Sequence, residues 1–319
     1  MQVFDMNKLT KNIIFNIHPT SLLLSAGSVL AGLAASVERG GVALFPAIMT
    51  LLVAVTFQVS ANLYYGFKRA DKWMAAHREG KDTLNPEGYK VMRPLSNAFG
   101  IVAITMAFPL FTRMGWLAMA YLAVLVAVVY LYFGGPRPLV RTRWGVFITF
   151  LLFGPIAVSG TAMVQNHYQQ IALTIPLYSI ISGLLAVMAH LCIQFVRIKD
   201  DVRDGMTSLL SEGGSRRVRM LYMVCVLTVC GIMIAFPQQV GLGHHWIAIV
   251  LSAVLLIASL YVYRLMGVDT MEAAMSLRKI VIVQYVIMMF AMLCIVLYPM
   301  DFWLTLLGYP VEGNRYFIR

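Results

Sequence analysis

Nine long apolar runs follow one another along the 319 residues of the chain, and no polar stretch is long enough to form a separate soluble domain. A helix needs about twenty apolar residues to cross the hydrocarbon core of a bilayer, whereas open strands would leave unpaired backbone groups in lipid. Only 12% of the residues are charged, against about 25% in soluble domains, which excludes a soluble globular protein. We therefore predict an all-α polytopic membrane protein with a single transmembrane domain over residues 1–319. The nine predicted spans are residues 20–37, 43–66, 95–112, 115–133, 144–164, 171–196, 218–236, 245–265 and 280–299.

The basic residues divide unequally between the two sides of these spans. All but four of the 25 Lys and Arg residues fall in the N-terminal segment or in every second connection, and the exceptions are Arg39, Arg113, Arg315 and Arg319. Positive charge in short loops marks the cytoplasmic side of a membrane. We therefore predict a cytoplasmic N-terminus, an odd number of spans and a location in the inner (cytoplasmic) membrane. This topology accounts for the net charge of +11, and we expect no nucleic-acid partner.

Two long connections on the predicted cytoplasmic side, residues 67–94 and 197–217, follow the second and sixth spans and collect many ionisable residues. At the end of the second span, Asn62, Gly66 and Arg69 recur at i, i+4 and i+7. A helix places residues with this spacing on one face. We expect any chemistry to lie at these two helix ends.

Arg197, Asp201 and Asp204 share a helix face in the same way at the end of the sixth span. Two such polar helix ends could hold an anionic ligand between them. The alternative is that these charges are only solvated anchors. In that case Arg197 would pair with Asp201 one turn away, and Arg69 would stack over Trp73.

Four segments carry a more specific pattern. Ile17-His-Pro-Thr-Ser-Leu22 opens the first span, Gln58–Asp71 closes the second, and Val196–Leu209 closes the sixth. The most specific segment is Phe133-Gly-Gly-Pro-Arg-Pro-Leu139, followed by Phe153-Gly-Pro-Ile-Ala-Val-Ser-Gly-Thr161. Together these segments resemble the UbiA superfamily of intramembrane prenyltransferases, and most of all its 1,4-dihydroxy-2-naphthoate polyprenyltransferase branch in menaquinone synthesis.

The resemblance implies a nine-helix bundle that transfers a polyprenyl group from its diphosphate to an aromatic quinone precursor. It also implies Mg²⁺ held by aspartates at positions 66, 69, 197 and 201. This chain has Gly66, Arg69, Arg197 and Asp201 there, so its Asp-rich motifs are degenerate. One aspartate beside two arginines is a poor site for Mg²⁺, because that ion prefers several hard oxygen ligands.

The charges that remain suit direct binding of a diphosphate by guanidinium groups rather than through a metal. The predicted diphosphate-binding residues are Asn62, Lys68, Arg69, Arg197 and Lys199. Asp201 is the candidate catalytic group. The candidate ligands for any metal are Asp201, Asp200 and Asp204.

Four further side chains are predicted to line the cavity of this site, namely Tyr65, Tyr132, His190 and Gln194. His190 and Gln194 precede Arg197 on a matching helix face, and the tyrosine rings could flank an isoprenoid or a carbocation. The alternatives are an interior histidine with satisfied hydrogen bonds and tyrosines of the interfacial belt.

Two other functions compete with transfer chemistry. The lost aspartates favour a catalytically degenerate paralogue that binds a lipid, a quinone or a polyprenyl compound, or that serves as a subunit of a membrane complex. A transporter is poorly supported, because the two halves lack corresponding Gly/Pro-broken helices.

Overall fold

The structure is a computed structural model of the chain. It describes residues 13–14, 16–37, 42–76, 86–115, 117–134, 138–166, 173–203, 207–238, 240, 245–268 and 271–297. Within this part of the chain nine helical spans follow one another, which confirms the predicted all-α class. They are α2 (Pro19–Val37), α3 (Leu44–Ala76), α4 (Pro86–Met114), α5 (Leu117–Phe133), the continuous span α6 (Trp144–Leu151), η2 (Leu152–Ile156) and α7 (Ala157–Asn166), then α8 (Thr174–Arg203), α9 (Leu209–Ala235), α10 (His245–Leu265) and α11 (Met271–Leu297); the 3-10 turn η1 (Leu139–Arg141) precedes α6.

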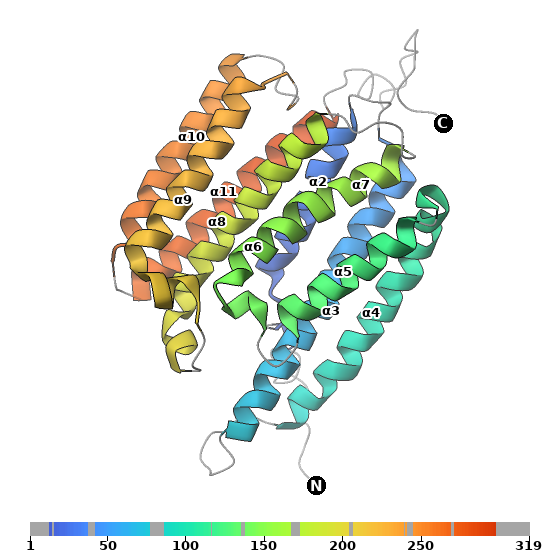
Figure 1. The fold of residues 1–319 in the computed structure, drawn as a ribbon, viewed down its shortest axis with the longest axis vertical. Helices are drawn as coiled ribbons and strands as arrows, with labels where there is room; N and C mark the ends of the chain where they lie inside the picture. The colour runs from blue at the N-terminus through green and yellow to red at the C-terminus, as the bar shows by residue number, and fades with distance from the viewer. Residues whose placement is uncertain are drawn as a thin grey trace.

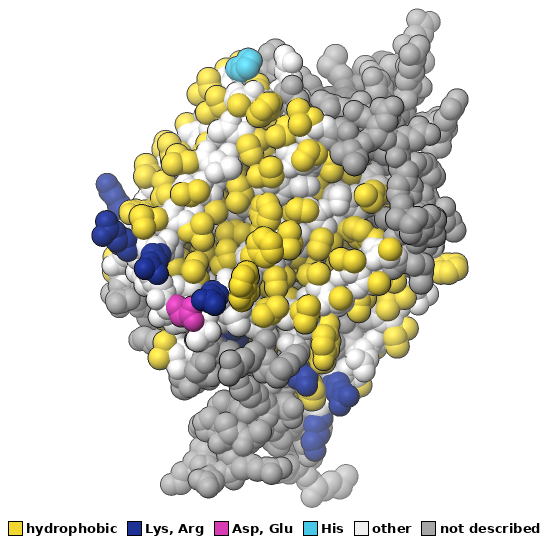
Figure 2. All heavy atoms as spheres, in the orientation of Figure 1, with side chains coloured by type: hydrophobic (Ala, Val, Ile, Leu, Met, Phe, Trp, Pro, Cys, Tyr) yellow, Lys and Arg dark blue, Asp and Glu magenta, His cyan; other side chains and the backbone are white. Residues whose placement is uncertain are grey.

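The outer surface of the bundle is apolar. Among the described residues six helices are long and apolar enough to cross a membrane, and three shorter apolar helices, Ser21–Val37, Ala120–Phe133 and Lys279–Cys294, accompany them. Figure 2 shows a broad field of hydrophobic side chains, with Lys and Arg gathered toward the lower part of the face in view. An exposed apolar surface of this extent is stable in lipid and not in water. The chain is therefore an integral membrane protein.

Two helices form the interior of the bundle (Figure 1). Helix α2 contacts α3, α7, α8 and α11, and α8 contacts α6, η2, α9 and α11. In the apolar 18-residue stretch of α8, 72% of the residues are buried, against 22–44% in the corresponding stretches of the other five long spans. Polar side chains on the buried faces of α8 consequently face protein rather than lipid.

The helices at the predicted cytoplasmic side are longer than the hydropathy pattern indicated. Helix α3 runs to Ala76 and α8 to Arg203, while α4 begins at Pro86 and α9 at Leu209. The predicted loops 67–94 and 197–217 are therefore wrong in extent. Residues 67–76 and 197–203 contain neither Gly nor Pro, so nothing stops a helix where its side chains turn polar.

The span between α6 and α7 contains a π-helical turn, η2, with Pro155 inside it. The Phe153 carbonyl oxygen in this turn accepts a hydrogen bond from Ser182 Oγ of α8 at 2.7 Å. Gly154 lies against Gly183 so closely that a Cβ on Gly154 would meet the α8 backbone. The turn is thus fixed to the most buried helix, and it forms one wall of the cavity described next.

Candidate ligand site

The charged end of the bundle is the end at which α3, α5 and α8 finish and α4, α6 and α9 begin (Figure 1, lower part). The ends of the second and sixth predicted spans, where the site residues were expected, both lie at this end of the bundle. The predicted site residues that the structure describes here, together with Arg141 and Thr149, come from α3, α5, η1, α6 and α8. An apolar cavity lies further into the bundle from them.

Asn62, the predicted diphosphate-orienting residue, is tied to neighbouring protein groups. Its Nδ2 donates to the Ile17 carbonyl oxygen at 2.8 Å and to Ser21 Oγ at 2.7 Å, and its Oδ1 accepts from Gln58 Nε2 at 3.0 Å. Gln58 Oε1 in turn accepts from Ser25 Oγ at 3.1 Å. Both amide hydrogens of Asn62 are therefore used to join the start of α2 to α3.

Gly66, one turn beyond Asn62, lies against Asn16. A Cβ built on Gly66 would be 2.5 Å from Asn16 Oδ1 and 3.0 Å from its Cγ. An aspartate at this position, as the family pattern has it, would have to displace Asn16. Asn16 therefore occupies the space that such an aspartate would need.

Asp201 is paired with an arginine that the sequence analysis did not select. Arg141 of η1 donates from Nε to Asp201 Oδ1 at 2.8 Å, and Arg141 Nη2 lies 2.7 Å from the same oxygen. Both side chains are buried, with 6% and 4% of their surface exposed. The alternative Arg197–Asp201 pair is wrong, because Asp201 turns to Arg141 across 60 residues of sequence.

Arg197 is half-buried at the charged end and forms no ion pair within the described part of the chain. It lies within electrostatic reach of both Tyr132 and His190. Lys68 places its Nζ 6.0 Å from the centre of the Tyr64 ring. Of the other predicted residues, the side chains of Arg69, Lys199, Asp200 and Asp204 lie outside the described part of the structure.

Tyr132, His190 and Thr149 form a buried hydrogen-bonded chain beside Arg197. Tyr132 Oη lies 2.7 Å from Thr149 Oγ1 and 3.4 Å from His190 Nδ1. Gln194, one turn further along α8, accepts at Oε1 from the Leu210 backbone nitrogen at 3.2 Å. The other side-chain nitrogens, His190 Nε2 and Gln194 Nε2, are buried and have no hydrogen-bond partner among the residues that the structure describes.

Tyr65 and Tyr132 belong to an aromatic cluster with Phe133. The Tyr132 and Phe133 rings meet edge to face with centroids 4.6 Å apart, and the Tyr65 and Phe133 centroids are 6.0 Å apart. Val129 packs against this cluster and also lines the apolar cavity. The cluster therefore lies between the polar end of the site and the cavity.

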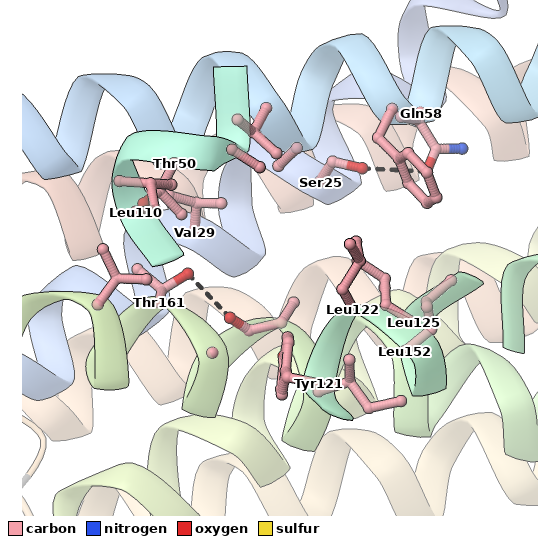
Figure 3. Close-up of a pocket in the computed structure, with 18 of the residues that line it drawn as sticks. Ser25, Val29, Thr50, Gln58, Leu110, Tyr121, Leu122, Leu125, Leu152 and Thr161 are labelled. Carbon is pink, nitrogen blue, oxygen red and sulfur yellow. Dashed lines mark hydrogen bonds between the residues drawn. The ribbon is translucent and has the colours of Figure 1, made fainter. Parts of the chain in front are cut away.

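The cavity has a volume of about 160 Å³ and is lined by residues of α2, α3, α4, α5, η2 and α7. Figure 3 shows Gln58 and Ser25, joined by their hydrogen bond, at one end, with Leu122 and Leu125 of α5 across from them. Thr50 and Leu110 line it two to three helical turns further from the charged end. Its surface is almost entirely apolar, which suits a hydrocarbon chain.

The described residues do not fit a magnesium site. Mg²⁺ requires several oxygen ligands in near-octahedral geometry, but the matching positions hold Gly66 and Arg197, and Asp201 is neutralised by Arg141. Among the described side chains, no three His, Cys, Asp or Glu groups are close enough to hold a metal ion.

Two residues of the site, Arg141 and Thr149, were missed by the sequence analysis. Arg141 lies just past the Gly-Gly-Pro turn that carries the most specific resemblance, and its place beside this segment could have identified it as a site residue. Thr149 lies within an apolar run, where a single hydroxyl gives no signal. Tyr132 and His190 contact each other, but none of the four predicted cavity residues, Tyr65, Tyr132, His190 and Gln194, is among those that line the apolar cavity.

The fold and site define a polytopic membrane protein with a polar, cationic end and, deeper in the bundle, an apolar cavity. The model of the UbiA prenyltransferase family matches residues 93–283, more than half of the chain. The chain belongs to this family.

Relatives agree with this assignment. The chain is 26% identical over 223 residues to a 1,4-dihydroxy-2-naphthoate octaprenyltransferase of Mycobacterium tuberculosis, covering 67% of this chain and 74% of that protein. The fold is similar to an apo UbiA homologue from Aeropyrum pernix K1, with a TM-score of 0.61 and 15% identity over 86% of this chain and 97% of that chain. It is also similar to a UbiA homologue from Archaeoglobus fulgidus bound to DMAPP and Mg²⁺, with a TM-score of 0.58 and 12% identity over 88% of this chain and 98% of that chain.

Proposed function

We propose that the protein is a membrane prenyltransferase that joins a polyprenyl group to an aromatic acceptor of the dihydroxynaphthoate type. The observation that carries the proposal is the apolar cavity of about 160 Å³, which lies deeper in the bundle than the cationic end, with the aromatic cluster of Tyr65, Tyr132 and Phe133 between the two. This arrangement matches an amphiphile with an anionic head and a hydrocarbon tail. The acceptor class comes from the Mycobacterium tuberculosis relative.

The reaction requires the carbon–oxygen bond between the first prenyl carbon and the diphosphate to break. The diphosphate leaves with the bonding electron pair, a ring carbon of the acceptor forms the new bond to the prenyl carbon, and that ring carbon loses its proton. The cavity holds the tail, which keeps the allylic carbon near the aromatic cluster. Enclosure by Tyr65, Tyr132 and Phe133 also shields the electron-deficient carbon from water and offers it ring faces.

Arg197 is the described residue best placed to hold the diphosphate. It is half-buried, within one helical turn of Gln194, and unpaired within the described residues. A guanidinium binds phosphate oxygens with two parallel hydrogen bonds. Lys68 adds charge at the same end, and Arg69 and Lys199 complete the proposed set, with Asn62 fixing the backbone that carries them.

In this proposal the protein binds the diphosphate without magnesium. The family supplies Mg²⁺ as a Lewis acid that stabilises the leaving diphosphate, and the Archaeoglobus fulgidus homologue is bound to Mg²⁺. In this chain arginines stand at two of the matching positions. They supply positive charge to the leaving group directly.

The charged end faces the cytoplasm in this proposal, and the membrane is the inner membrane. The support is the distribution of Lys and Arg, since only Arg39, Arg113, Arg315 and Arg319 fall on the other side. A water-soluble aromatic acid made in the cytoplasm would then reach the site without crossing the bilayer.

A catalytically degenerate binding protein is the second candidate function. The observation in its favour is the buried Arg141–Asp201 pair, which removes the remaining motif aspartate from metal binding. Such a protein would bind polyprenyl diphosphates without releasing diphosphate.

One assay separates the two candidates. The purified protein in lipid nanodiscs is given isoprenoid diphosphates of several lengths with 1,4-dihydroxy-2-naphthoate, and both diphosphate release and prenylated product are measured. We expect turnover, with Arg197→Gln raising the KM for the donor about 10-fold or more, because a hydrogen bond to a charged group contributes about 1.5–3 kcal/mol. Arg143→Gln is the matched control, because the Arg143 side chain at the same end is 63% exposed.

The control variant should keep the wild-type KM. Absence of turnover with every donor, beside an active family member, would overturn the transferase proposal. Binding without turnover would then support the degenerate binding protein.

A further inference from the structure

We propose that His190 and Gln194 bind the aromatic prenyl acceptor, through hydrogen bonds to a hydroxyl group and to a neighbouring anionic oxygen on its ring. These two residues are called the acceptor pair. The inference rests on the proposed function and deepens it by naming the groups that select the acceptor. It starts from two buried nitrogens, His190 Nε2 and Gln194 Nε2, that have no hydrogen-bond partner among the described residues. Their side chains belong to residues only 7% and 5% exposed.

Unpartnered polar atoms are costly inside a membrane protein. A buried polar group without a partner lowers the stability of the protein by an amount comparable to a hydrogen bond. The interior of a membrane offers no water to replace the missing partner. Two such atoms on adjacent turns of the most buried helix therefore indicate a bound ligand that completes them.

The hydrogen-bonded chain sets the chemical character of His190. Thr149 has a single hydroxyl hydrogen, and it donates to the Gly145 carbonyl oxygen at 2.7 Å. Tyr132 must therefore donate its own hydrogen to Thr149 Oγ1, the shorter of its two contacts at 2.7 Å. The Tyr132 oxygen is then left to accept from His190 Nδ1 at 3.4 Å.

His190 Nε2 is consequently a lone-pair acceptor, because a neutral imidazole carries only one hydrogen. It accepts a hydrogen bond from a ligand hydroxyl.

Gln194 has the opposite character. Its Oε1 accepts from the Leu210 backbone nitrogen, which fixes the amide orientation and leaves Nε2 as a donor. Residues four apart on a helix are about 5–6 Å apart at Cβ. The pair therefore presents one acceptor and one donor to a ligand, with the charge of Arg197 one turn beyond.

An aromatic ring with a hydroxyl next to a carboxylate matches this pattern. The hydroxyl donates to His190 Nε2, and the carboxylate accepts from Gln194 Nε2 and is attracted by Arg197. Tyr132 belongs both to the hydrogen-bonded chain and to the aromatic cluster. A ring held by the pair therefore lies beside the aromatic side chains and next to the route from the cavity.

The test compares two probes that differ in one hydroxyl, 1-hydroxy-2-naphthoate and 2-naphthoate, by isothermal titration of the full-length protein in nanodiscs. We expect wild-type protein to bind the hydroxylated probe about 10-fold more tightly, as for one buried hydrogen bond. His190→Asn keeps a donor near the Nδ1 position and removes Nε2, so it should abolish the preference. His190→Gln returns an acceptor near Nε2 and should restore it.

Gln194→Leu supplies a second, independent measurement. It should weaken binding of both naphthoates about 10-fold and leave the hydroxyl preference intact. His245→Asn is the matched control, because His245 is an exposed histidine at the first residue of α10. This variant should change neither the affinity for the naphthoates nor the hydroxyl preference.

No hydroxyl preference in wild-type protein, or an unchanged preference in His190→Asn, would overturn the inference. Failure of the proposed function would be detected by separate measurements, namely diphosphate release and binding of the prenyl donor. A protein that shows the naphthoate preference but never binds a polyprenyl diphosphate would refute the transferase and leave the acceptor pair standing.

Discussion

The buried Arg141–Asp201 pair links two elements of the charged end. It joins η1 to α8, with Arg141 Nη2 2.7 Å from Asp201 Oδ1. At that separation and an effective dielectric constant of about 20, the Coulomb attraction is about 6 kcal/mol. Desolvation of both groups offsets much of this, so the measurable quantity is the cost of removing one partner, about 3–5 kcal/mol for a buried pair.

Asp201→Asn leaves the Arg141 charge buried and should lower the free energy of unfolding by about 3–5 kcal/mol, measured by titration with denaturing detergent. The double variant Arg141→Met with Asp201→Leu should recover most of that loss, because apolar side chains of similar size replace a buried pair at little cost. The exposed pair Arg143 and Glu212, 3.8 Å apart, is the matched control and should show a coupling below about 1 kcal/mol.

The single variants Arg141→Met and Asp201→Leu complete a double-mutant cycle. If the stability losses of these two single variants simply add in the double variant, the two side chains are not coupled and the reasoning is refuted. A structural pair also predicts that the double variant still binds polyprenyl diphosphate. If Asp201→Asn folded normally and lost a magnesium-dependent activity, Asp201 would be a metal ligand or a catalytic group instead.

Three further predictions concern the walls of the site. Asn62→Leu should destabilise the protein by about 2–4 kcal/mol in the same detergent titration, because the buried Gln58 and the part-buried Ile17 carbonyl and Ser21 hydroxyl lose a hydrogen-bond partner; an unchanged stability would contradict the network. Leu125→Trp should fill the cavity and raise the KM for long donors more than for the shortest one in the diphosphate-release assay, and equal effects on all donors would place the tail elsewhere. Gly66→Ala should cost about 1–2 kcal/mol by overpacking against Asn16, and the double variant Gly66→Ala with Asn16→Ala should relieve that cost.

The fold follows from the sequence because hydropathy reports the solvent of each segment directly. Apolar runs of bilayer length predict the number, order and class of the spans. Helix ends were less predictable, since hydropathy falls at Phe67 and Arg197 while helix propensity does not. Pro94 also marked a start for α4 in the sequence, yet the helix runs through it from Pro86.

The site was predictable only in part. His190, Gln194 and Arg197 share one helix face, so spacing alone places them together. The partner of Asp201 could not be predicted, because Arg141 lies 60 residues away and only tertiary packing brings η1 onto α8. Local spacing favoured Arg197 as that partner, and long-range geometry decided otherwise.

The central claim is that this chain holds a polyprenyl diphosphate with arginine rather than through magnesium. Isothermal titration of a farnesyl or longer isoprenoid diphosphate into the purified protein, with a chelator and then with added Mg²⁺, tests it most directly. We expect binding with the chelator present, little change on adding Mg²⁺, and a loss of affinity in Arg197→Gln. Binding that appears only when Mg²⁺ is added would contradict it.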